Sequence, residues 1–139
     1  MLTPKKVKHR KWQTGRKKHN FVKVENRGIE ISFGSHGLKA TSYARVNSRQ
    51  LESARKVLSR AASKLGRIWI RVFPDRPVTQ KPPEVGMGKG KGDPQYFCAE
   101  VFPGRVLFEI DGVDAVVAKE ALRKAGTKLP LKTRIITRV

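Results

Sequence analysis

Glycine alternates with other residues near the middle of the chain, in the segment G-M-G-K-G-K-G that runs from Gly86 to Gly92. Glycine has no side chain, so its backbone N–H groups can come close to an anion, and the interleaved lysines add positive charge. Such a segment suits contact with a phosphate backbone. It lacks the spacing and the hydroxyl of the nucleotide-binding motif G-x-x-x-x-G-K-[ST], and Lys91 stands where G-x-G-x-x-G needs its third glycine. The alternative interpretation is a flexible linker.

Few side chains in the sequence suit acid–base catalysis. Glu100, Glu109 and Asp111 are the carboxylates closest together in predicted strands. Alternation puts Glu109 and Asp111 on the outward side, beside the inward Phe108 and Ile110. We therefore expect solvated carboxylates at these positions and not an acid–base pair.

Nucleophilic and metal chemistry also have little support in the sequence. Ser35 and His36 are neighbours in a predicted turn, where adjacent residues do not face each other as a nucleophile and its base must. The single cysteine, Cys98, is predicted to be a buried, unreactive thiol that has no internal partner for a disulfide, which is compatible with a reducing cytosol. His9 and His19, like His36, share no ligand spacing with it. We expect no metal, no cofactor and no enzymatic activity.

The glycine-rich segment follows a predicted strand. Residues 68–73 alternate, with Ile68, Ile70 and Val72 on one side, which is typical of a half-buried strand. Residues 74–94 have no hydrophobic period and contain five prolines. We expect a long loop over 74–94 that cannot order on itself and whose partner lies outside the chain.

A basic helix is predicted before this strand. Short strands are expected around 29–33 and 38–42, with a turn at 34–37. The helix begins after Asn47 as N-cap, with Gln50 at the capping-box position, and Gly66 is expected to end it in a left-handed conformation. Its apolar side is expected to carry Leu51, Ala54, Leu58, Ala61 and Leu65, and its opposite side Arg49, Lys56, Arg60 and Lys64. At this net charge we favour a nucleic-acid-binding role for the cationic side over plain solvated surface.

The second half of the chain adds further short elements. Strands at 95–101 and 106–110 are joined through Pro103-Gly104, which predicts a hairpin. A second helix is expected over 114–128 and a last strand over 132–137. Sequential strands with two interspersed helices indicate an α+β fold with a mixed or antiparallel sheet.

Length and charge predict one domain with an anionic partner, for which a membrane surface, a polyanionic sugar or nucleic acid could all serve. The 139 residues divide into a basic arm at 1–28 and a body at 29–139 that contains the loop. The chain has 31 Lys and Arg against 11 Asp and Glu, a net charge of +20, which implies an anionic partner. Residues 1–24 hold nine of these cations and no acid, and such arms commonly order on a polyanion, where an aromatic such as Trp12 can stack on a base. The alternative is a solvated tail.

Membrane insertion and organelle targeting are disfavoured. No apolar run approaches the roughly 18 residues that a membrane-spanning helix needs. The basic, acid-poor N-terminus superficially resembles a transit peptide, but it is lysine-rich and has no serine before Ser32.

Several segments together resemble the bacterial large-subunit ribosomal protein L-sixteen family. They are GRIWIRVFPDRPVTQKP at 66–82, MGKGKGDPQYF at 87–97, SFGSHGLKA at 32–40, SRQLESARK at 48–56, PGRVLFEIDGV at 103–113 and KLPLKT at 128–133, together with MLTPK and the RKW–GR element near the start. The likeness covers nearly the whole chain and is weakest at 19–28.

The resemblance implies a hammerhead-type α+β fold, a seat in large-subunit rRNA and a place beside A-site tRNA near the peptidyl transferase centre. It implies a cytoplasmic protein of the large ribosomal subunit that has neighbouring large-subunit proteins as partners, forms no homo-oligomer, contacts no membrane and catalyses nothing itself. The residues expected to bind rRNA are Lys5, Lys6, Lys8, Arg10, Lys11, Trp12, Arg16, Lys17, Lys18, Arg49, Lys56, Arg60, Lys64, Arg71 and Arg76. The loop residues expected to reach toward tRNA are Lys81, Gly86, Met87, Gly88, Lys89, Gly90, Lys91 and Gly92.

One position departs from the family pattern. Many members have arginine immediately before MGKGKG, where it can be hydroxylated in some bacteria, and this chain has Gly86. Two alternatives to a ribosomal role remain from the sequence: a free-standing nucleic-acid-binding regulatory or architectural protein, and an RNA-modifying enzyme that binds a cofactor phosphate with its glycine loop. The first is disfavoured because no helix-turn-helix or RRM pattern is present.

Overall fold

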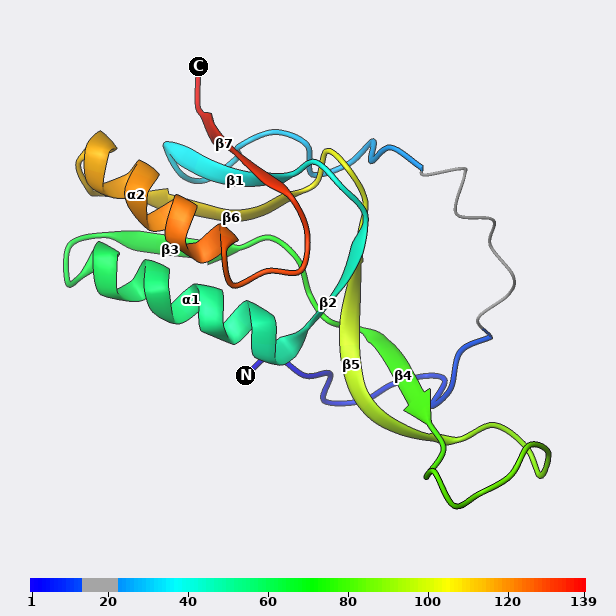
Figure 1. Cartoon of the computed structure of the whole chain (residues 1–139). Helices are drawn as coiled ribbons and strands as arrows, with labels where there is room; N and C mark the ends of the chain where they lie inside the picture. Colours follow the sequence, from blue (N-terminus) through cyan, green and yellow to red (C-terminus); the bar gives the residue numbers. More distant parts are fainter. Residues whose placement is uncertain (14–22) are drawn as a thin grey trace.

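The computed structural model describes residues 1–13 and 23–139 (Figure 1). Within these residues the elements follow in the order β1 (His36–Ala40), β2 (Ala44–Asn47), α1 (Ser48–Ala62), β3 (Arg67–Ile70), β4 (Arg76–Gln80), β5 (Asp93–Val101), β6 (Val106–Asp111), α2 (Ala115–Gly126) and β7 (Thr133–Thr137).

The strands form two antiparallel sheets. The larger sheet has the strand order β3-β6-β1-β7, and the smaller one has the order β2-β5-β4. In the part of the chain that the structure describes, all five strand pairs are antiparallel. The predicted α+β class with an antiparallel sheet is confirmed.

Both helices pack beside each other on one face of the larger sheet. Phe108 and Ile110 of β6 and Leu38 of β1 meet Leu58 of α1 and Leu122 of α2 in one continuous core, which also takes in Val46 and Val101 of the smaller sheet. Full burial of each large apolar side chain stabilises the fold by about 1.5–3 kcal/mol. This core gives the rest of the molecule a rigid support.

The beginning of α1 follows the sequence signal, and its end does not. The N–H of Gln50 donates to Asn47 Oδ1 over 2.9 Å, and the N–H of Asn47 donates to Gln50 Oε1 over 3.0 Å, so the predicted capping box is confirmed. The predicted stop at Gly66 is wrong, because the helix ends at Ala62 and Ser63 takes the positive φ. Leu65, expected on the apolar side, lies outside the helix and is exposed. Gly66 is still required, since a Cβ there would lie 2.7 Å from the carbonyl oxygen of Ala62.

One predicted strand and one predicted hairpin are wrong. Residues 29–33 form no strand, and β1 begins inside the predicted turn and pairs with β6 and β7. Strands β5 and β6 do not form a hairpin, because they belong to different sheets. The Pro103-Gly104 turn instead carries the chain from one sheet to the other, where the N–H of Gly104 donates to the carbonyl of Ala40.

The loop predicted over 74–94 is shorter than expected. Strand β4 and the first residues of β5 fall inside this range and pair with each other, which leaves 81–92 as the connection. The predicted strand at 68–73 correspondingly ends at Ile70. A hydrophobic period was absent because β4 buries Arg76 and contains Pro77, which an edge strand tolerates. In Figure 1 this β4–β5 hairpin extends away from the helices and the larger sheet.

Candidate nucleic-acid interface

The described part of the N-terminal arm presents its cations to solvent. Its exposed residues include Lys5, Lys6, Lys8, Arg10, Lys11 and Trp12. Arg16, Lys17 and Lys18 lie outside the described residues. Exposed Lys and Arg side chains on an extended segment are suited to phosphate contacts.

The arm lies along the β4–β5 hairpin, from the start of β4 to the loop end of β5. Lys11 Nζ donates to the carbonyl oxygen of Lys91 over 3.0 Å and lies 4.0 Å from Asp93 Oδ1. The guanidinium of Arg76 lies over the Trp12 ring, 5.7 Å from its centroid. A cation over an aromatic face contributes about 0.5–2 kcal/mol, depending on its exposure to water. The arm and the glycine-rich loop, which the sequence separates widely, are therefore neighbours.

Helix α1 carries a cationic side opposite its core-facing side. Arg49, Lys56 and Arg60 are exposed, whereas Leu51, Ala54 and Leu58 are buried. Lys64 is exposed too, but it lies beyond the end of the helix. Arg55 is engaged by Glu52 in an ion pair of 2.6 Å. Arg49, Lys56 and Arg60, which were all predicted for this side, are the exposed cations of α1 that pair with no described carboxylate.

The tip of the hairpin consists of backbone and exposed side chains. Gly88 and Gly90 adopt positive φ angles of 97° and 88°, and Lys89 between them has a φ of 60°. A Cβ added at Gly86, Gly88 or Gly90 would meet no described atom within 4 Å. Met87 is fully exposed. Lys81 Nζ donates to the carbonyl oxygen of Gly88 across the loop. The tip thus offers backbone groups and lysines to an external partner.

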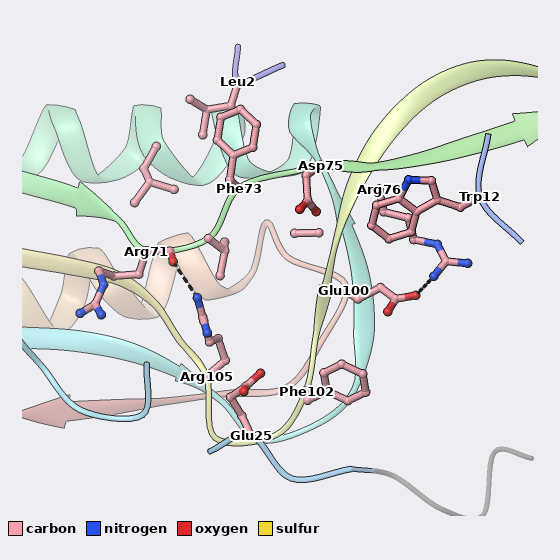
Figure 2. A pocket seen from close by; sticks show the side chains of 13 residues that line it. Leu2, Trp12, Glu25, Arg71, Phe73, Asp75, Arg76, Glu100, Phe102 and Arg105 are labelled. Carbon is pink, nitrogen blue, oxygen red and sulfur yellow. Dashed lines mark hydrogen bonds and ion pairs between the residues drawn. The ribbon is translucent and has the colours of Figure 1, made fainter. Parts of the chain in front are cut away.

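Arg71 and Arg76 differ from the other candidate cations because the body itself engages them. Arg71 Nη1 donates to Glu109 Oε1 over 2.7 Å, and Arg76 is buried and paired with Glu100. Figure 2 shows the Arg76 guanidinium directed to Glu100. Both arginines therefore help to hold the fold together. The sequence did not distinguish this role from RNA binding.

The family described as Ribosomal protein L16p/L10e matches residues 4–136, which is nearly all of the 139 residues. The chain belongs to this family. It is accordingly a protein of the large ribosomal subunit, and the family consists of structural ribosomal proteins. This membership replaces the alternative of a free-standing regulator.

Glu109 of this L16p/L10e protein was predicted to be solvated, and that prediction is wrong. Its side chain is fully buried, because residues 29–34 cover the sheet face that alternation assigned to solvent. Its carboxylate accepts the N–H groups of Ser32, Phe33 and Gly34 over 2.7–3.0 Å, besides the bond from Arg71. Burial alone would raise the pKa of Glu109, but these four hydrogen bonds outweigh it and hold the pKa below its usual range.

The structure also shows the contacts of the cysteine and of the neighbouring serine and histidine. Cys98 is buried as predicted, and burial raises the pKa of its thiol, which keeps it unreactive. Ser35 Oγ lies 3.0 Å from His36 Nδ1, so these neighbours do meet, contrary to the prediction. Ser35 Oγ also donates to the carbonyl of Ile110, a local contact that ties the start of β1 to β6.

Residues 1–13 and 23–139 contain neither a metal-binding cluster nor a membrane-spanning helix. No group of three or more His, Cys, Asp or Glu side chains in this part of the L16p/L10e chain is arranged to hold a metal ion. None of its described helices has the length and apolarity needed to cross a bilayer.

Proposed function

We propose that this L16p/L10e protein binds large-subunit rRNA through its basic arm and the cationic side of α1. The arm contributes Lys5, Lys6, Lys8 and Arg10, all exposed, and the helix contributes Arg49, Lys56 and Arg60. Because the net charge is +20, phosphate neutralisation supplies most of the binding free energy. If on the order of ten phosphates are contacted, log K falls with log salt at a slope of about −7 to −9.

We also propose that the β4–β5 hairpin contacts A-site tRNA near the peptidyl transferase centre. The observation that supports it is the exposed tip, where Met87, Lys89 and Lys91 face solvent and Gly86, Gly88 and Gly90 have open space around them. The bond from Lys81 to the carbonyl oxygen of Gly88 crosses the loop but leaves its lysine and methionine side chains exposed, and a bound partner would order them further. The hairpin is long enough to hold this tip away from the body, which leaves the arm and α1 free to bind rRNA.

The proposed position in the large subunit also determines the other partners of the chain. Neighbouring large-subunit proteins surround the chain, which acts as a single copy in each subunit, makes no membrane contact and stays with the ribosome in the cytoplasm. It acts by binding and positioning RNA and not by catalysing a reaction.

Fractionation of native lysate on sucrose gradients tests the proposal. The chain is followed by mass spectrometry at low and at high salt. We expect one copy for each large subunit at low salt, and a partial release at high salt because the contacts with phosphate are screened. A chain that migrates free of large subunits at low salt, or with DNA, would overturn the proposal.

A further inference from the structure

A cavity of about 570 Å³ lies between the N-terminal arm and the junction of the two sheets (Figure 2). This volume is within the range of pockets that hold small organic groups. Its walls include Trp12 of the arm, Phe73 and Asp75 from the segment that joins β3 to β4, and Phe102 and Arg105 from the corner between β5 and β6. The cavity is therefore a joint product of the arm and the body.

Aromatic side chains give the cavity flat apolar walls. Phe73 is 47% exposed and Trp12 is 38% exposed, although both are large aromatic residues. Pro74, the neighbour of Phe73, is fully buried. This burial fixes the segment, so Phe73 and Asp75 on either side of Pro74 are held at the cavity. Nucleobases stack favourably on such a ring.

Asp75 supplies an acceptor that the described residues leave unused. The other two carboxylates at the cavity are engaged: Glu100 pairs with Arg76, and Glu25 Oε1 accepts the N–H groups of Asn26 and Arg27. Figure 2 shows no hydrogen bond or ion pair from the residues drawn there to Asp75, whose carboxylate points into the cavity. A carboxylate next to a phosphate-binding surface repels phosphate, but it can accept hydrogen bonds from a nucleobase edge.

We infer that this cavity binds one unstacked guanine of the large-subunit rRNA. Phe73 stacks on the base, and the two oxygens of Asp75 accept N1–H and one N2–H of its Watson–Crick edge. Guanine is the base that presents two adjacent donors on this edge, which matches a bidentate carboxylate. The inference rests on the proposed rRNA binding, to which it adds a base-specific contact among contacts that are otherwise made with phosphates.

Removing the charge of Asp75 should change the RNA affinity in opposite directions under the two interpretations of the surface. A surface that contacts only phosphates binds RNA more tightly when a carboxylate is removed, because repulsion is lost. A carboxylate that pairs with guanine binds less tightly when it is replaced by an amide. We expect Asp75→Asn to weaken binding to purified large-subunit rRNA at least about fivefold, as expected when a bidentate base contact is lost. Asp111→Asn is the matched control, since Asp111 is exposed and does not line the cavity.

Chemical probing of the bound rRNA identifies the base. Kethoxal modifies N1 and N2 of accessible guanines. With the wild-type chain one guanine should be protected, and this protection should be lost with Asp75→Asn and with Phe73→Ala while the rest of the footprint is kept. Circular dichroism melting of each variant shows whether it is folded, and a variant that melts like the wild type qualifies for the comparison.

The outcomes distinguish this inference from the proposed function. If the wild type binds rRNA and Asp75→Asn behaves like Asp111→Asn, without a change at any guanine, the guanine site is overturned and the rRNA-binding proposal stands. Protection that changes at an adenine or cytosine also overturns it. If the wild-type chain shows no footprint on rRNA, the proposed function itself fails.

Discussion

Arg71 Nη1 donates a hydrogen bond to Glu109 Oε1 over 2.7 Å, and that carboxylate is fully buried. The pair links the segment after β3 to β6, and three backbone N–H groups of residues 32–34 complete the coordination of the carboxylate. The guanidinium of Arg71 also lies over the Phe33 ring, 5.2 Å from its centroid. The segment that leads from the arm into the body is thereby fixed to the larger sheet.

This buried carboxylate makes stability depend on acid pH. Because the pKa of Glu109 is lower in the folded state than in the unfolded chain, the unfolded state binds more protons in this range. The contribution is fully present above the unfolded pKa of about 4.3 and is lost as the pH falls toward the folded pKa. Urea unfolding of the full chain at a series of pH values should show this decrease in the free energy of unfolding.

Glu109→Gln tests the origin of that decrease. The variant leaves Arg71 without its charged partner and should lower the free energy of unfolding at neutral pH by about 3 kcal/mol. It should also have a weaker dependence on acid pH than the wild type. Asp111→Asn, two residues along and exposed, should change the stability little. Equal effects of the two substitutions would contradict the assigned role of Glu109.

Removing residues 1–13 should weaken rRNA binding in a salt-dependent way. This segment holds five Lys and Arg residues, and each phosphate contact contributes about 0.7–0.9 to the slope of log K against log salt. If all five contact phosphates, the magnitude of the slope falls by about 3.5–4.5. Filter binding at several salt concentrations measures this slope for the full chain and for the truncated chain. A chain with the same five residues changed to Gln serves as the control, and a slope that stays the same in both would refute phosphate contacts by the arm.

Gly86 should accept an arginine without loss of stability. No described atom lies within 4 Å of a Cβ at this position and its φ is not positive, so Gly86→Arg should melt like the wild type. The same substitution at Gly92 is the matched contrast, because its Cβ would lie 2.8 Å from the backbone of Gln80. Gly92→Arg should destabilise the hairpin by about 1–3 kcal/mol. Thermal unfolding compares the melting temperatures of the two variants. Equal melting temperatures would contradict the difference in space between Gly86 and Gly92.

Local sequence signals predicted the helices well because their causes are local. The capping box at Asn47 and Gln50 and the spacing of Leu51 and Leu58 depend only on α1 and its N-cap residue. The same holds for the second helix and the last strand, which the structure contains as α2 and β7 with shifted ends.

Pairings and burial that depend on distant residues were predicted less well. Glu109 was assigned to solvent because alternation says nothing about residues 29–34, which lie more than 70 residues away and cover it. Strand β4 was missed because its buried residues are Arg76 and Pro77, and the partner of Arg76, Glu100, is on another strand. The proximity of Lys11 to Lys91 likewise depends on the tertiary fold. The cationic residues of the interface were visible in the sequence, whereas the separation of Arg71 and Arg76 from the free cations needed the structure.

Large subunits that carry Lys89→Ala and Lys91→Ala together test the proposed contact between the loop and A-site tRNA. Sucrose gradients show whether the chain assembles into large subunits. The affinity of the A site for aminoacyl-tRNA reports the contribution of the loop. We predict normal assembly, because the arm and α1 are unchanged, and a loss of A-site affinity of about tenfold or more, as expected for two charged contacts. Lys119→Ala with Lys128→Ala removes the same charge from exposed positions far along the chain and should leave A-site binding unchanged. Normal A-site binding by subunits that lack Lys89 and Lys91 would contradict the proposed role of the loop.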